Sequence, residues 1–156
     1  MDATQVEAIE KGWLRNMFWR KRHFHGNDAG DEWVVGELER QAINFPCAST
    51  VSDIVSRACA NIEKEFEQRG WTIRWQGLNG LVMSLHDGIY YELHPDIFFD
   101  ACEIIKRNLE IEYHGLSIPV DLKAGPTWGD CKKLKISLTD RSWRDAVDLQ
   151  PLIRSY

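Results

Sequence analysis

An acidic residue followed two positions later by a lysine occurs at Asp121-Leu122-Lys123. Carboxylates are ligands that Mg²⁺ prefers, and a metal-bound water can attack a phosphate whose charge a lysine stabilises. The period-2 pattern of this region places Glu110, Glu112, Asp121 and Lys123 on one face of a predicted hairpin. These residues predict a candidate enzyme, a divalent-metal-dependent nuclease with Glu110 and Asp121 as ligands and Lys123 at the scissile phosphate.

In its spacing, this tripeptide resembles the end of the PD-(D/E)xK nuclease signature. Pro95-Asp96 stands upstream as that signature requires, and the resemblance implies Asp96 as a further metal ligand. The sequence departs from the signature because a predicted helix, rather than a direct strand connection, separates Asp96 from Asp121. The alternative is that the charges form the solvated outer face of a half-exposed hairpin whose other face is apolar.

A second group with metal-binding chemistry is His23-Phe24-His25, which Asp28 and Asp31 follow closely. Imidazole and carboxylate groups within one loop are ligands for a transition metal. Turn formation explains the Asn, Asp and Gly content of the same loop, and surface histidines explain the rest. For this loop, a metal site is therefore a weaker interpretation than a turn with surface histidines.

The segment from Lys11 to His25 holds five Lys and Arg residues and no acid: Lys11, Arg15, Arg20, Lys21 and Arg22. Trp13, Phe18 and Trp19 are interleaved with them, and aromatic residues among cations are typical of surfaces that bind nucleic acids. The same pattern also fits a helix that packs its apolar side in the core and exposes a cationic face, or one that meets an acidic protein or a membrane surface.

Two other features favour a protein partner. The segment from Asp28 to Glu39 holds five acids and no base, and a loop at residues 125–130 contains Pro, two Gly and a tryptophan. Trp128 is predicted to anchor the partner, because tryptophan is a typical interface residue. Alternatively, Trp128 folds back as a lid on the core. The predicted partner-binding residues are Trp128, Asp130, Asp28, Asp31, Glu32 and Glu37.

Periodicity and turn residues define the elements that must position these groups. Helices are expected at 3–22, 31–45, 50–69 and 95–105, strands at 71–75, 81–85, 89–93, 109–113, 116–122 and 134–138, and a last short helix after Asp140. The predicted fold is α+β, with a twisted, mainly antiparallel sheet of about six strands. N-terminal helices and a central helix are expected to pack on one face of this sheet.

One domain is expected over residues 1–156, because this length can bury a sizeable core. It would comprise a helical part (1–70), a β-rich part with one inserted helix (71–139), and a C-terminal helix and tail (140–156). The N-terminus has no signal-peptide pattern, no apolar run is long enough for a membrane span, and the four cysteines show no metal spacing. A cytoplasmic protein with reduced thiols is expected.

The formal net charge of -5 argues against broad attraction to nucleic acid. No P-loop, GxSxG, HExxH or paired Cys/His nucleophile is present, so no cofactor is predicted. Size, acidity and missing motifs together favour a non-enzymatic inhibitor, of the kind that immunity proteins and phage-encoded inhibitors represent. It would occlude a macromolecular partner, most simply a protein with a basic surface. The nuclease and a nucleic-acid-binding protein are the alternatives, and the oligomeric state is open.

Overall fold

The computed structural model describes residues 3–25, 32–71, 80–85, 88–113 and 115–150. The chain divides into two compact units, Met1–Arg57 and Ala58–Tyr156, which we call unit 1 and unit 2. Helix α2 (Glu32–Gln68) contributes its residues up to Arg57 to unit 1 and the remainder to unit 2. Each unit is described by itself below.

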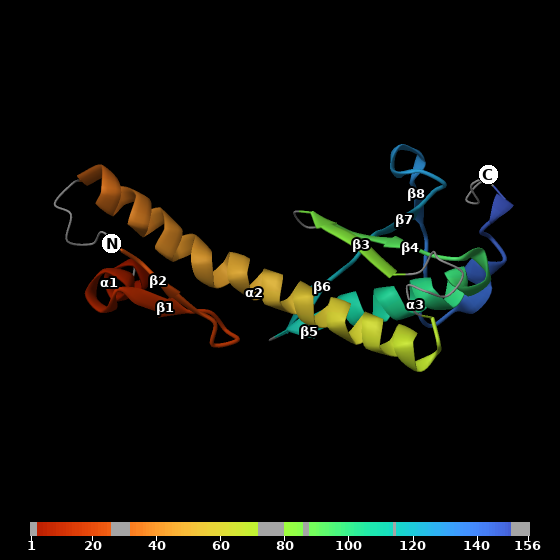
Figure 1. The fold of residues 1–156 in the computed structure, drawn as a ribbon, viewed down its shortest axis with the longest axis horizontal. Helices are drawn as coiled ribbons and strands as arrows, with labels where there is room; N and C mark the ends of the chain where they lie inside the picture. Colours follow the sequence, from red (N-terminus) through yellow and green to blue (C-terminus); the bar gives the residue numbers. More distant parts are fainter. Residues whose placement is uncertain (1–2, 26–31, 72–79, 86–87, 114, 151–156) are drawn as a thin grey trace. The chain divides into compact units, whose positions relative to one another are not determined.

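Unit 1 begins with helix α1 (Ala3–Lys11), which ends at Gly12. Gly12 adopts a φ of 67° and its N–H donates to the Ala8 carbonyl at 3.0 Å, a left-handed helix end that glycine accommodates without a steric penalty. Strands β1 (Trp13–Arg15) and β2 (Lys21–His23) then pair as an antiparallel hairpin (Figure 1). The prediction of one helix over 3–22 is therefore wrong beyond Lys11, because Gly12 stops it.

The core of unit 1 joins α1, the hairpin and α2. Its buried residues come from all three elements and are Ala8, Leu14, Phe24, Leu38, Ala42 and Phe45, with Val34 packed against them. Phe24 and Phe45 meet edge to face with ring centroids 6.3 Å apart, a favourable aromatic geometry. The hairpin is thus fixed to the helices by its buried side chains.

Helix α2 continues through Pro46, where the sequence predicts a break. Proline inside a helix costs about 3 kcal/mol, because it removes one backbone hydrogen bond and its ring crowds the preceding turn. Phe45 before the proline and Ile54 after it are both buried, so the apolar stripe continues across it. The predicted pair of helices is wrong because burial of this stripe outweighs the local cost.

In unit 2, helix α3 (Phe98–Leu109) follows a short 3-10 helix η1 (Pro95–Ile97), which confirms the helix predicted after Pro95. Figure 1 shows α3 running beside the part of α2 that belongs to unit 2. The two helices share a core whose buried members are Ile62, Phe66, Ile97, Ala101, Ile104 and Ile105. Glu65 of α2 also accepts hydrogen bonds from Arg107 at 2.5 Å and Asn108 at 2.9 Å.

The described strands of unit 2 form three antiparallel hairpins. They are β3 (Gly80–Leu85) with β4 (Gly88–Glu92), β5 (Ile111–Tyr113) with β6 (Leu116–Ile118), and β7 (Leu122–Ala124) with β8 (Lys132–Leu134). The β3–β4 hairpin and the β5–β6 pairing confirm the two predicted hairpins. The predicted strand 71–75, beyond Trp71, and the turn residue Asp87 lie outside the described residues.

The prediction of one sheet of about six strands is wrong for the described residues, whose eight strands form four separate two-stranded pairs. Pro119 has no N–H to donate, and β6 ends just before it. The chain then resumes as β7 and pairs with β8, so the strand predicted at 134–138 is displaced to Lys132–Leu134. The mixed helix and strand content agrees with the predicted α+β class.

The C-terminal part of unit 2 packs on α3. Asp140 caps a 3-10 helix η3 (Arg141–Arg144) by accepting from the Ser142 N–H at 2.9 Å, where the sequence predicts a short helix. Trp143 is buried with Phe98 and Cys102 in a further core cluster. None of the helices within the described residues is long and apolar enough to span a membrane.

Candidate functional site

The five cations between Lys11 and Arg22 lie on and around the β1–β2 hairpin of unit 1. In the register of the hairpin, Arg15 lies directly opposite Lys21, and Trp13 lies opposite His23. Because side chains alternate between faces, these four residues share one face, which we call the cationic face. Leu14, between Trp13 and Arg15, points to the other side and is buried.

The cationic face places two positive charges directly across from each other. Like charges at opposing positions of an antiparallel pair destabilise it. Neither Arg15 nor Lys21 forms an ion pair with a carboxylate in the part of the chain that the structure describes. The arrangement is therefore suited to an anion that neutralises both charges, and a phosphate group is one anion that arginine and lysine bind through charge-assisted hydrogen bonds.

Trp13 supports the two cations. The Lys21 ammonium lies 4.2 Å from the centre of the Trp13 ring and the Arg15 guanidinium lies 5.1 Å from it. Both distances are within the range of an attractive cation–π contact. The indole holds the two side chains over the hairpin without removing their charge.

The three remaining cations of the segment have partners within unit 1. Lys11 pairs with Glu7 at 2.7 Å, Arg20 pairs with Asp53, and Arg22 donates to the Gln41 side chain at 2.7 Å. Arg22 also lies 5.3 Å from the ring centre of Phe24. These contacts position the hairpin, so Arg15 and Lys21 are the members of the predicted set that remain best placed for a ligand.

A buried polar pair fixes the turn between the two strands. The side-chain amide of Asn16 donates to Asp53 of α2 at 2.5 Å, and both residues are buried. The Asn16 side-chain oxygen accepts from the N–H groups of Phe18 at 3.0 Å and Arg20 at 2.9 Å. The turn that carries Met17, Phe18 and Trp19 is thus attached to the helix by a satisfied hydrogen-bond network.

The turn held by Asn16 carries two aromatic side chains, Trp19 and Phe18. Trp19 is 75% exposed at the turn, and the Arg15 guanidinium lies 5.3 Å from its ring centre. The Phe18 ring lies 4.2 Å from the Arg57 guanidinium of α2. Sequence reasoning identified the cations and the interleaved aromatics, but it missed Asn16, Asp53 and Arg57. No local pattern links positions 16 and 53.

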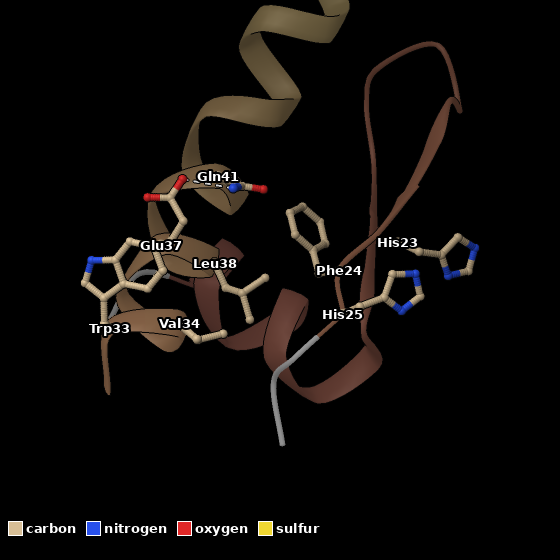
Figure 2. Close-up of a pocket in the computed structure, with 8 residues that line it drawn as sticks. All are labelled: His23, Phe24, His25, Trp33, Val34, Glu37, Leu38 and Gln41. Carbon is tan, nitrogen blue, oxygen red and sulfur yellow. Dashed lines mark hydrogen bonds between the residues drawn. The ribbon is translucent and has the colours of Figure 1, made fainter. Parts of the chain in front are cut away.

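A hollow of about 320 Å³ lies in unit 1 between the end of the hairpin and the start of α2. Figure 2 shows Phe24 directed toward the helix, and His23 and His25 side by side away from Glu37. The imidazole rings stack with centroids 6.3 Å apart. Asp28 and Asp31, the predicted carboxylate ligands, lie outside the described residues.

Two of the acidic residues predicted to bind a protein partner, Glu37 and Asp130, form local hydrogen bonds. Glu37 accepts from Arg40 and from the Gln41 amide at 2.9 Å, and the Gln41 hydrogen bond, followed by that of Arg40, lowers the pKa of Glu37. Glu32 is exposed in the first turn of α2. Asp130 accepts from the Thr127 hydroxyl at 2.5 Å.

The Trp128 side chain is partly packed and partly exposed, which is intermediate between the predicted interface anchor and the predicted lid on the core. It packs on Tyr90 of β4 with ring centroids 4.5 Å apart, yet 59% of its surface is exposed. It is neither a lid on the core nor a freely projecting side chain.

The predicted nuclease residues belong to two different hairpins. Glu110 precedes β5, where it accepts from Lys106 and, at 3.3 Å, from the Val120 N–H. Asp121 pairs with Lys133 at 2.7 Å, and this hydrogen bond is the main cause that lowers the pKa of Asp121. Lys123 lies opposite Lys133 in the β7–β8 pair. The predicted single charged face is wrong, because Pro119 separates β6 from the strand that carries Lys123.

Asp96, the further ligand that the resemblance implies, is exposed in η1 near His94. Among residues 3–25, 32–71, 80–85, 88–113 and 115–150, no three His, Cys, Asp or Glu side chains come together in a group that could hold a metal ion.

Comparison with known proteins identifies the family. Residues 1–130 match DNA polymerase family A. The chain belongs to this family. It is 30% identical over 134 residues to DNA polymerase I of Lactococcus lactis subsp. cremoris, a match that covers 85% of this chain and 14% of that protein. DNA polymerase theta of Drosophila melanogaster is 26% identical over 132 residues, covering 83% of this chain and 6% of that protein.

A solved DNA polymerase structure shares the fold. The POL domain of Pol1 from M. smegmatis, in complex with DNA primer-template and dNTP, superposes with a TM-score of 0.60 at 19% identity. The superposition covers 69% of this chain and 18% of that domain chain. This chain therefore spans a small part of the family A polymerases that it matches.

Family membership corrects the functional prediction. The inhibitor or immunity-type protein is wrong, because the family and its relatives are DNA polymerases. The predicted protein partner with a basic surface has no support, whereas a family A neighbour binds a DNA primer-template. The nuclease alternative is replaced by the same finding.

Polymerases use divalent metal ions clamped between carboxylates and substrate phosphates. Within the described residues, no group of three potential ligands is present. The chemistry of the described residues is that of charge, aromatic surface and hydrogen bonding.

Proposed function

We propose that this family A chain binds primer-template DNA through the cationic face of its β1–β2 hairpin, with Arg15 and Lys21 on the phosphate backbone. The observation that carries the proposal is the cross-strand pair of cations, which has no carboxylate partner among the described residues. The DNA bound by a family A structural neighbour supports the choice of ligand.

The physical basis is electrostatic. A duplex carries a dense line of phosphate charges, and a protein that neutralises some of them releases condensed counterions. Arg15 has a planar guanidinium that can bind two phosphate oxygens, and Lys21 adds a compact charge directly opposite it. Contacts of this kind position the protein on DNA without reading the base sequence. The proposed binding is therefore independent of sequence.

Fluorescence anisotropy with a labelled primer-template tests the proposal. The double substitution Arg15→Ala and Lys21→Ala is expected to weaken binding by at least about tenfold, because two charge-assisted contacts together exceed about 1.4 kcal/mol. The matched control is the double substitution Lys132→Ala and Lys135→Ala, which removes two exposed cations of unit 2. The control is expected to bind within about twofold of wild type. Equal affinity of the hairpin variant and wild type would contradict the proposal.

A further inference from the structure

We infer that Trp19 is a stacking platform for an unpaired base of the bound DNA, at the single-stranded part of a primer-template. The inference rests on the proposed function and deepens it, because it assigns the hairpin turn to a different part of the nucleic acid from the hairpin strands. Its evidence is the backbone of Trp19, the exposure of its ring and the charge around it.

The backbone of Trp19 is strained. Its φ of 66° lies in the left-handed region, and Trp19 is the only described residue other than glycine that has a positive φ. Glycine or asparagine occupies such a position with far less strain than a bulky side chain. An observed outlier of this kind indicates a functional demand on the residue when the surroundings hold it in place.

Hydrogen bonds hold the backbone of Trp19 in this conformation. The Trp19 N–H donates to the Asn16 carbonyl at 3.0 Å, and the N–H groups on either side of it donate to the Asn16 side chain. Asn16 is itself bound to the buried Asp53. The backbone of the turn is thus held at its base by these hydrogen bonds.

The exposed ring is flanked by positive charge. Three quarters of the Trp19 surface is exposed, and Arg15 lies 5.3 Å from the ring centre. Arg15 is the residue that we place on a phosphate, so the base of a neighbouring nucleotide would lie close to the Trp19 ring. An aromatic face beside a cationic backbone site is the arrangement by which proteins bind single strands.

The geometry favours an unpaired base over a base pair. Inside a duplex both faces of each base are covered by neighbouring bases, whereas the bases of a single strand are open to stacking on a protein ring. A primer-template offers such bases beyond the end of the primer. Trp13, in contrast, lies under the Lys21 and Arg15 cations and is only partly exposed, so it serves as their support.

The test compares two labelled DNAs that share one duplex sequence, a blunt duplex and a primer-template with a single-stranded template extension. Wild type is expected to bind the extended DNA more tightly. Trp19→Gly is expected to weaken binding to the extended DNA by about fivefold to 100-fold and to leave the blunt duplex within about twofold, since stacking is lost and phosphate contacts remain.

Trp19→Gly also controls for folding. Glycine accepts the left-handed conformation, so the thermal midpoint of this variant is expected to equal or exceed that of wild type. Trp19→Asn, which also tolerates this conformation, is the second variant, and it is expected to show the same loss. Trp19→Phe keeps an aromatic face and is expected to retain part of the preference for the extended DNA.

The outcomes separate this inference from the proposed function. Tight binding of both DNAs, unchanged in Trp19→Gly and Trp19→Asn, would overturn the stacking role and leave the phosphate contacts standing. Equal weakening on both DNAs would also overturn it, because Trp19 would then contact the duplex. Failure of wild type to bind either DNA would contradict the proposed function, and the inference would fall with it.

Discussion

Arg15 and Lys21 face each other across the β1–β2 hairpin, an arrangement that lowers stability unless an anion lies between them. The sequence alone indicated the residue types of the proposed site, because cations interleaved with tryptophan are a local feature of the sequence. It could not predict their pairing. That required the hairpin, and the hairpin follows from the left-handed Gly12 that ends α1.

Glu63 is a partly buried carboxylic acid of unit 2 whose ionisation bears on stability. Burial raises its pKa, and the charge of Glu67 adds to this, although the backbone N–H of Leu81 opposes it. One of its carboxylate oxygens is buried without a hydrogen-bond partner among the described residues. The folded protein therefore favours the protonated form of Glu63 more strongly than the unfolded chain does.

This predicts a pH-dependent contribution to stability. Because the folded pKa lies above the unfolded value of about 4.3, the contribution is fully present below that pH and is lost as pH rises through the folded pKa. Glu63→Gln is expected to remove this decline, so the free energy of unfolding of the variant increases relative to that of wild type as the pH rises. Urea unfolding from about pH 4 to about pH 7 measures it. Glu112→Gln, at an exposed position of β5, is the control and should retain the wild-type pH profile. Parallel profiles for Glu63→Gln and wild type would contradict the prediction.

At the scale of elements, the attachment of the hairpin to α2 was beyond sequence reasoning. Asn16 and Asp53 are 37 positions apart, and nothing local marks them as partners. Helix α2 shows the opposite case, since Pro46 is a strong local signal that the structure overrides by burying one apolar stripe on both sides of it. The β3–β4 and β5–β6 hairpins were predictable because short turns and alternation are local features.

Asp53→Ala tests the attachment. The substitution leaves the buried Asn16 amide without its acceptor and Arg20 without its ion pair. The free energy of unfolding is expected to fall by about 1–3 kcal/mol, the usual cost of an unsatisfied buried polar group. Urea unfolding is the measurement. Ser52→Ala, at the exposed neighbouring position of α2, is expected to change stability by less than about 0.5 kcal/mol. An Asp53→Ala variant as stable as the Ser52→Ala control would show that the pair does not hold the turn.

At the scale of the whole molecule, the net charge pointed away from the family. The formal net charge of -5 argued against nucleic acid, whereas the family is that of DNA polymerases. Net charge describes long-range attraction, but binding to DNA depends on which charges lie on the contact surface. The proposed DNA contact uses two of the five cations that lie without an acid between Lys11 and His25, a local feature that the net charge does not describe.

The most direct test of DNA binding by the cationic face is the salt dependence of that binding. The dissociation constant of wild type and of the Arg15→Ala, Lys21→Ala variant for primer-template DNA would be measured by anisotropy at several salt concentrations. Wild-type affinity is expected to fall steeply with salt, and the variant is expected to lose about 1.5–2 units of the log–log slope, since each phosphate contact contributes about 0.9. Parallel slopes for the two proteins, or wild-type binding that salt does not change, would contradict the assignment of Arg15 and Lys21 to the phosphate backbone.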